Sequence, residues 1–209
     1  MKSLLDLENW NRKEHFEHFS KMEEPFFGVT VEIDCTKAYQ TAKNLKTSFF
    51  IFYLHKTLVA VNSIENFKYR ISEGKIYIND CIDVSATIGR EDGTFGFSFI
   101  EYNADFKIFE SNALTEIERI QKTSGLFTRS FDYDNLIHFS AIPWLNFTSL
   151  SHARSYSYPD SCPKISFGKM MTSKTGKKTM AMSVHVHHGL MDGLHVGQFV
   201  DLFQELMND

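Results

Sequence analysis

A cluster of histidines near the carboxyl end of the chain has the residue types best suited to chemistry. Nine histidines occur among 209 residues, and four of them fall between residues 185 and 195. If the segment ending at residue 188 is a strand, alternation places His188 on the face that carries Met182, Val184 and Val186. Burial beside apolar side chains lowers the pKa of an imidazole and keeps it neutral near pH 7. A neutral, fixed imidazole is what a general base requires, so the segment predicts one at His188.

Structural interpretations of the same residues stay open at this point. A histidine at a strand end is often a hydrogen-bonded structural residue without a catalytic role. Asp192 follows four residues after His188 and precedes Gly193. Aspartate is a preferred N-cap, so Asp192 could order the loop of His188 or simply begin the last helix.

A metal site is a further alternative. His185 and His187 share the opposite face of the predicted strand, and Cys162 or His195 could complete a ligand set. However, no Cys-x-x-Cys or His-Glu-x-x-His motif accompanies them. A metal is therefore the weaker hypothesis, and we expect none.

Hydrophobic periodicity predicts the elements that must position these residues. The pattern indicates, in chain order, a strand at 26–34, a helix at 49–63 capped by Ser48, hairpins at 70–78 and 85–102, a helix at 103–122, a strand at 136–142, a hairpin at 165–187 and a helix at 194–207. Hairpins outnumber plausible parallel crossovers. We therefore expect an α/β two-layer sandwich, an α+β fold with a mixed, mostly antiparallel sheet and helices packed on it, formed by residues 1–209 as a single domain.

Composition narrows the classes of function. The chain has 22 Lys and Arg against 26 Asp and Glu, a net charge of −4, and no basic block, which argues against nucleic acid as a partner. The longest apolar run, residues 49–54, is too short to cross a membrane. Acidic residues follow the first five positions, so no secretory signal is expected. Three separated cysteines, Cys35, Cys81 and Cys162, fit reduced thiols and a cytoplasmic location.

Four segments together resemble one enzyme family. The block from His187 to Val196 is similar to the His-His-x-x-x-Asp-Gly-Phe-His-Val signature of chloramphenicol acetyltransferases. Residues Trp10 to Phe16, Phe139 to Trp144, and Pro163 to Lys169 resemble further segments of that family. They occur in family order and cover essentially the whole chain. The shorter motif His-x-x-x-Asp-Gly is shared with dihydrolipoamide acyltransferases, which also carry lipoyl and linker segments that this length does not accommodate.

The resemblance implies a mechanism and an assembly. It implies a homotrimer with active sites at subunit interfaces, acetyl-CoA as co-substrate, no metal, and chloramphenicol as acceptor, hence antibiotic resistance. In the family pattern, His188 takes the proton from the acceptor hydroxyl, and the alkoxide attacks the thioester without forming an acyl-enzyme. Ser140 corresponds to the donor that stabilises the oxyanion. Asp192 and Arg12 correspond to an ion pair that holds the catalytic loop.

The residues implied to contact the substrates match the family pattern less fully than the residues of the mechanism do. Phe19, Phe27 and Phe95 match positions that line the acceptor pocket, and Ser166 stands where the family usually has Thr near bound water. Lys169 matches a CoA contact, but Met170 replaces the usual Tyr.

Two segments depart from the family pattern beside the pocket, at residues 23–26 and 149–154. Another alcohol acceptor is therefore an alternative to chloramphenicol. A non-catalytic CoA-binding module is a second alternative.

Overall fold

The computed structural model describes residues 1–130, 134–154 and 160–209. Its elements follow in the order β1 (Lys2–Leu4), α1 (Lys13–Phe19), β2 (Phe26–Asp34), α2 (Thr36–Leu45), α3 (Phe49–Ser63), the 3₁₀ turn η1 (Glu65–Lys68), β3 (Tyr69–Ser72), β4 (Lys75–Asn79), β5 (Asp83–Gly89), β6 (Phe95–Phe97), α4 (Phe106–Gln121), β7 (Leu136–Ala141), β8 (Lys164–Phe167), β9 (Met171–Thr172), β10 (Lys178–His187) and α5 (Gly193–Met207). No helix within these described ranges is long and apolar enough to cross a membrane.

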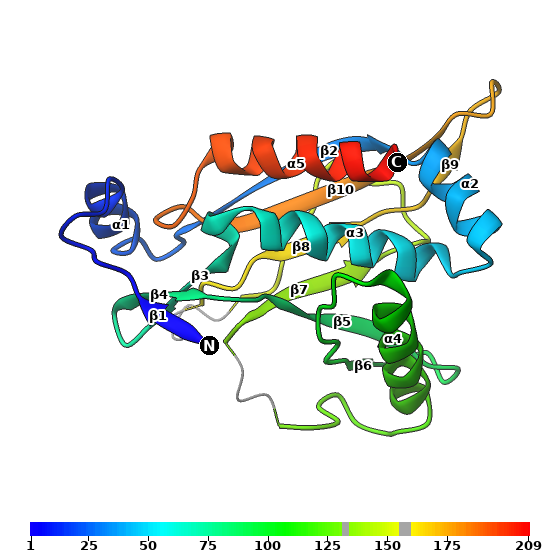
Figure 1. Ribbon diagram of the computed structural model, residues 1–209, viewed down its shortest axis with the longest axis horizontal. Coiled ribbons are helices and arrows are strands. Elements are labelled where there is room, and N and C mark those ends of the chain that lie inside the picture. Colours follow the sequence, from blue (N-terminus) through cyan, green and yellow to red (C-terminus); the bar gives the residue numbers. More distant parts are fainter. Residues whose placement is uncertain (131–133, 155–159) are drawn as a thin grey trace.

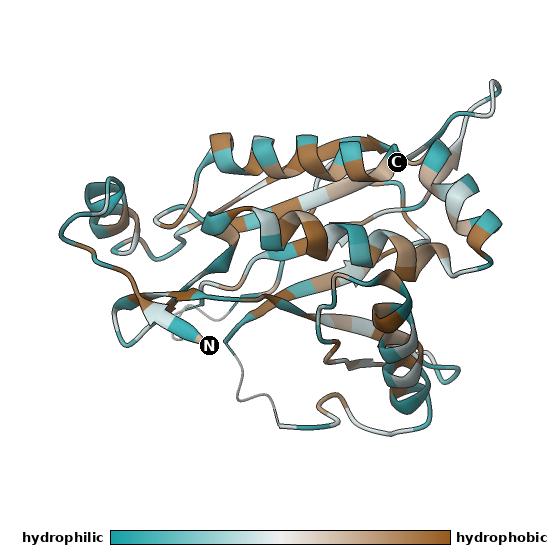
Figure 2. Cartoon of the chain, in the orientation of Figure 1, coloured by the Kyte–Doolittle hydropathy of each residue, from teal (hydrophilic) through white to brown (hydrophobic). Residues whose placement is uncertain are grey.

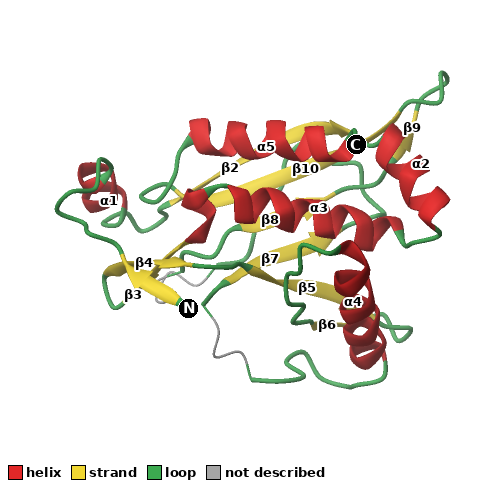
Figure 3. Ribbon diagram, in the orientation of Figure 1, coloured by secondary structure: helices red, strands yellow, loops and turns green. Residues whose placement is uncertain are grey.

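The main sheet is mixed, and helices cover one of its faces. Its strand order is β2-β10-β8-β7-β5-β6, with β9 paired to β10. The strands β5, β7 and β8 run parallel to one another, whereas β10 is antiparallel to both β2 and β8. The helices α3 and α5 lie side by side across this sheet, and β1, β4 and β3 form a separate small sheet (Figures 1 and 3). The expected two-layer α/β fold is confirmed.

Alternation along the strands creates the core. One face of the sheet carries buried apolar side chains that pack against α3 and α5, including Val84, Ile137, Phe139, Ile165, Phe167, Met182, Val184 and Val186. α5 alternates between hydrophobic and hydrophilic residues along its length, as an amphipathic helix does (Figure 2). Phe199 and Phe203 of α5 are fully buried. The opposite face of the sheet, which we call the outer face, is therefore left for polar residues.

The hairpins expected from turn residues are present. Between β3 and β4, Glu73 and Gly74 have φ values of 50° and 70°, the left-handed conformation that a two-residue turn needs and that glycine adopts without strain. The β5–β6 hairpin and the turn before β10 lie where expected, although β6 is shorter than the sequence pattern suggested. The helices α3, α4 and α5 occupy the predicted segments.

Several small elements were not expected from periodicity. α2 buries only Ala38 and Ala42, and α1 buries only Phe16, so neither shows a long apolar stripe. Ser48 precedes α3, but its side chain makes no capping hydrogen bond. Asp105 does cap α4, accepting hydrogen bonds from the N–H groups of Lys107 and Ile108.

Candidate active site

Two aromatic rings hold the imidazole of His188 just after the end of β10. The backbone N–H of His188 donates to the carbonyl of Pro25 at 2.8 Å, which extends the pairing with the start of β2. The imidazole lies parallel to the Phe19 ring, with 3.8 Å between centroids and 6° between planes, and 4.6 Å from the Phe27 ring. Its Nδ1 is buried and has no hydrogen-bond partner in the described structure. Phe19 and Phe27, expected to line the acceptor pocket, thus contact the histidine itself.

Arg12 and Asp192 form an ion pair beneath the loop of His188. Arg12 is 7% exposed; its Nη1 lies 2.6 Å from Oδ2 of Asp192, and its Nη2 donates to the carbonyl of His188 at 3.2 Å. The other carboxylate oxygen, Oδ1, accepts the N–H of Leu194 at 3.0 Å at the start of α5. Asp192 therefore caps the helix and pairs with Arg12 at the same time.

The pKa of Asp192 reflects these contacts. Partial burial disfavours the ionised carboxylate, but the hydrogen bonds from Arg12 and from the Leu194 N–H outweigh it and hold the pKa below the ordinary value. The carboxylate is thus ionised at neutral pH, which keeps the ion pair intact.

A second, small hydrophobic cluster positions Arg12. Trp10 packs edge-on against Phe16 of α1, at 6.4 Å between centroids, and against Tyr69 of β3, at 5.5 Å. Leu190, from the loop after His188, is buried in the same cluster. The amino-terminal segment and the loop of His188 are therefore joined by packing as well as by the ion pair.

His187, the neighbour of His188, is fixed on the outer face. It is 4% exposed, and its Nδ1 accepts the backbone N–H of Gly189 at 3.1 Å. Burial lowers its pKa to about 4, so it is neutral near pH 7. A Cβ at Gly189 would lie 3.0 Å from Cε1 of His187 and 3.3 Å from the Phe16 backbone, so this turn favours glycine.

The histidines considered for a metal have other neighbours. His185 Nδ1 lies 3.3 Å from the hydroxyl of Ser183, and its ring packs edge-on against His152 at 4.7 Å. His195 Nδ1 lies 2.9 Å from Oδ1 of Asp192. In the part of the chain that the structure describes, no group of three His, Cys, Asp or Glu residues is placed to hold a metal ion.

Ser140 belongs to a row of hydroxyl groups across the outer face. The strand register aligns Ser140 of β7, Ser166 of β8, Ser183 of β10 and Thr30 of β2, and a hydrogen bond adds Thr87 of β5 beside Ser140. Thr87 donates to the Ser140 hydroxyl at 3.3 Å, which leaves the Ser140 hydrogen available for another acceptor. Ser166 is 1% exposed, and its hydroxyl has no partner among the described residues.

His188 and Ser140 do not meet within one chain. His188 lies five residues beyond Ser183, the residue of β10 that aligns with Ser166 and hence with Ser140. That offset corresponds to about 16 Å along the strands and about 10 Å across two strand spacings. The two side chains also point to opposite faces, because His188 contacts Phe27 on the core-facing side.

The candidate residues therefore form two groups. Phe95 is 45% exposed and packs against Phe97 at 5.6 Å on β6, at the sheet edge opposite β2. Lys169 is exposed beyond β8, where its backbone N–H donates to the carbonyl of Leu145 at 2.7 Å. The group near the loop after β10, which we call the histidine half-site, contains Arg12, Phe19, Phe27, His188 and Asp192. The group on the outer face and its edge, the serine half-site, contains Phe95, Ser140, Ser166 and Lys169.

Sequence reasoning did not single out Thr87. Its place beside Ser140 depends on the pairing of β5 with β7, which the pattern of a single strand does not reveal. The hydrogen bond that holds the His187 ring could not be predicted from the strand pattern either, because its donor is the backbone N–H of Gly189 in the following turn.

Comparisons with known proteins match one family over nearly the whole chain. The sequence model of the family "Chloramphenicol acetyltransferase" matches residues 2–204. Chloramphenicol acetyltransferase 3 of Escherichia coli is 28% identical over 205 residues, covering 98% of this chain and 96% of its own length. The chloramphenicol acetyltransferase of Bacillus pumilus is 27% identical over 201 residues, covering 96% and 91%.

Solved structures agree with the sequence comparisons. A chloramphenicol acetyltransferase superposes with a TM-score of 0.89 at 31% identity, covering 99% of this chain and all of the other. A probable dihydrolipoamide acetyltransferase from Listeria monocytogenes gives a TM-score of 0.67 at 15% identity, covering 93% and 88%, a likeness of fold.

Proposed function

The chain belongs to the chloramphenicol acetyltransferase family, and from that premise we propose that it transfers the acetyl group of acetyl-CoA to a hydroxyl of an alcohol, with chloramphenicol as the expected acceptor. The observation that carries this proposal is the arrangement around His188. Its imidazole is stacked on Phe19, and its loop is held by the Arg12–Asp192 ion pair. Such preorganisation suits a residue whose task is to accept one proton in a fixed direction.

The proposed reaction is a direct transfer. His188 removes the proton from the acceptor hydroxyl, and the resulting alkoxide forms a bond to the thioester carbonyl carbon. The hydroxyl of Ser140 donates to the oxyanion of the tetrahedral intermediate. Collapse of the intermediate breaks the carbon–sulfur bond, and the leaving thiolate of CoA takes the proton back from His188. No covalent acyl-enzyme is needed.

The separation of the two half-sites supports an active site shared between copies of the chain. Because His188 and Ser140 point to opposite faces, we propose that the histidine half-site of one chain meets the serine half-site of the next. Three copies related by a threefold axis would close such a head-to-tail contact into a ring with equivalent sites. The proposed assembly is a homotrimer.

Charged groups beside the outer face support a second candidate acceptor. Arg154 forms an ion pair with Glu24, and its guanidinium lies 3.4 Å from the centroid of the Phe26 ring. These residues belong to the two segments, 23–26 and 149–154, that depart from the family pattern. An alcohol other than chloramphenicol, acetylated by the same base and donor, is therefore the alternative.

The location that we propose is the cytoplasm. Cys35, Cys81 and Cys162 are free thiols, which supports a reducing compartment. If chloramphenicol is the acceptor, acetylation there would give antibiotic resistance.

A thiol-release assay tests the function. Purified protein is mixed with acetyl-CoA and chloramphenicol, and free CoA is followed with a thiol reagent, beside the variant His188→Ala. We expect release that requires chloramphenicol and is abolished in the variant, whose melting temperature and oligomeric state should stay unchanged. Release with other alcohols but not chloramphenicol would support the second candidate. No release with any acceptor would reject the enzyme and leave the CoA-binding module.

A further inference from the structure

The thiol of Cys162 lies just before β8, among charged side chains that the proposed reaction does not use. Its Sγ lies 3.0 Å from the carbonyl oxygen of Leu136, at the start of β7. His138 follows two residues later on β7; its backbone N–H donates to the carbonyl of Pro163 at 2.9 Å, and its imidazole is hydrogen-bonded to the Cys162 thiol. The thiol is half-buried and His138 is exposed, so a small molecule can reach the pair from the outer face.

A buried guanidinium approaches the same sulfur. Arg70 of β3 is 2% exposed and donates to the carbonyls of Phe67, Tyr69 and Leu136, the last being the oxygen that the Cys162 sulfur contacts. In the part of the chain that the structure describes, no carboxylate forms an ion pair with Arg70, and its Nε has no hydrogen-bond partner. A buried cation without a counter-ion is costly, so this position favours an anionic neighbour.

Two carboxylates influence Arg70 without contacting it. Asp134 and Asp160 each form an ion pair with a lysine, so their charges are already balanced. Burial lowers the pKa of Arg70, and among the anions that raise it again Cys162 contributes most, ahead of Asp134 and Asp160. The thiolate of Cys162 is therefore the main counter-charge available to the guanidinium.

The same groups favour the ionised form of Cys162. Burial disfavours a thiolate, but the charge of His138 and the hydrogen bond from its imidazole, together with Arg70 and Lys164, hold the pKa of Cys162 below its ordinary value. The charge of Cys162 in turn raises the pKa of His138. The pair is therefore stabilised as thiolate and imidazolium, the form in which a cysteine attacks electrophiles.

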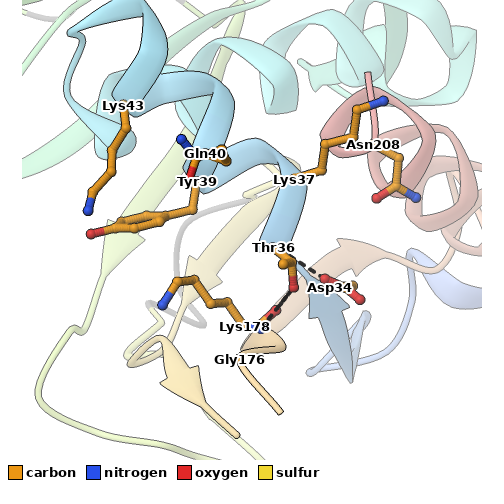
Figure 4. A pocket seen from close by; sticks show the side chains of 9 residues that line it. All are labelled: Asp34, Thr36, Lys37, Tyr39, Gln40, Lys43, Gly176, Lys178 and Asn208. Atoms are coloured by element: carbon orange, nitrogen blue, oxygen red, sulfur yellow. Dashed lines mark hydrogen bonds between the residues drawn. The ribbon is translucent and has the colours of Figure 1, made fainter.

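The other two cysteines lack such neighbours. Cys35 is fully buried, although Asp34 and Thr36 on either side of it line a pocket at the start of α2 (Figure 4). Burial and the charge of Asp34 raise the pKa of Cys35 to about 11. Cys81 is half-buried, as Cys162 is, and burial raises its pKa. The chain thus contains a control thiol of similar exposure with the opposite electrostatics.

We propose that Cys162, paired with His138 and Arg70, is a nucleophilic thiolate and the site at which soft carbon electrophiles modify this chain. With an α-haloamide, the sulfur forms a bond to the α-carbon, the carbon–halogen bond breaks, and halide leaves with the electron pair. The proton that the thiol has given up stays on His138 until solvent takes it. This reaction needs no acceptor alcohol and no acetyl-CoA, so it is independent of the proposed acetyl transfer.

Alkylation of the native full-length protein with limiting iodoacetamide, followed by peptide mapping, tests the thiol. At pH 7 we expect Cys162 to be labelled about tenfold faster than Cys81 or more, because the fraction of thiolate sets the rate. Cys35 should stay unlabelled until the chain is unfolded. Labelling of Cys162 at the rate of Cys81, or more slowly, would overturn the proposal.

The variant His138→Asn tests the source of the reactivity. It removes the charge beside the sulfur and keeps a polar side chain, so labelling of Cys162 at pH 7 should slow by about fivefold or more. At about pH 10, where ordinary thiols are ionised, the variant and the parent protein should react alike. His15→Asn, at an exposed histidine elsewhere, is the control and should match the parent protein. No slowing, or a slowing of equal size at both pH values, would overturn the pairing of the thiolate with His138.

Discussion

The imidazole of His188 is held mainly by aromatic rings that pack against it. Phe19 covers one face at 3.8 Å between centroids, Phe27 adds a tilted contact, and the Arg12 guanidinium holds the backbone carbonyl. Aromatic packing restricts rotation about χ2 without consuming a ring nitrogen. The ring of His188 is thus oriented by packing, and among the described residues its Nδ1 has no hydrogen-bond partner.

At Ser140 we predict an effect on the chemical step. The variant Ser140→Ala removes the proposed oxyanion donor, so kcat should fall by about 10²- to 10³-fold while the KM for both substrates changes little. Steady-state kinetics measures both constants. Thr87→Val, which removes only the neighbour that donates to Ser140, is the matched control and should have a much smaller effect. A rise in KM with normal kcat would show instead that Ser140 binds substrate.

His187 should make folding stability sensitive to acid. Its pKa is lowered to about 4 by burial, whereas an exposed imidazole titrates near 6.5. Between these values the unfolded chain binds a proton that the folded chain does not. The contribution of His187 to the free energy of unfolding is therefore fully present above pH 6.5 and is lost as the pH falls toward 4. Its size is at most about 3 kcal/mol.

Denaturant unfolding at several pH values measures this contribution. His187→Asn keeps a hydrogen-bond acceptor for Gly189 but does not titrate, so the loss of stability from pH 6.5 to 4 should become smaller. Replacement of the exposed His15 by Asn serves as the control. An identical pH dependence in the His187 variant would contradict the assignment.

At the scale of elements, the start of α5 couples the fold to the site. Asp192 caps the helix through Oδ1 and pairs with Arg12 through Oδ2, so one side chain fixes both the helix and the loop of His188. The same residue was open to two interpretations from sequence, cap or loop-ordering group, and the structure shows that the two contacts coexist.

Asp192→Asn should therefore reduce activity and stability together. The amide can still cap the helix, but it loses the charge that faces a nearly buried guanidinium. Breaking one side of such a pair costs about 3–5 kcal/mol when it is fully buried, and less here because the Asp192 side chain is partly exposed. Thermal unfolding and kinetics on one preparation measure both effects. A large loss of activity with an unchanged melting temperature would contradict the structural role.

Elements with a strong local pattern were predictable, and those without one were not. β2 and β10 alternate clearly, which was enough to place His188 on the core-facing side. α2 was missed because a helix that buries only Ala38 and Ala42 has no apolar stripe. The parallel neighbours β5, β7 and β8 were also beyond prediction, because strand order is set by packing between segments distant in sequence.

At the scale of the whole molecule, the family motifs predict the residues of the site and place it between subunits, but they do not predict which of those residues lie together in one chain. Motifs report residue identity, whereas the separation of His188 from Ser140 follows from strand register and face. Large apolar side chains are exposed near the serine half-site: Trp144 after β7 is 79% exposed, and Phe95 of β6 is 45% exposed. Exposed aromatic surface of this kind is typical of a contact with another chain.

Complementation between two inactive variants tests the shared active site most directly. His188→Ala and Ser140→Ala proteins are unfolded together in equal amounts, refolded, and assayed for thiol release beside each variant refolded alone. In a randomly mixed trimer, one interface in four would join an intact His188 to an intact Ser140, so we predict about a quarter of the parent activity. Activity no greater than the mean of the two variants alone, in a mixture shown to contain mixed oligomers, would contradict the account.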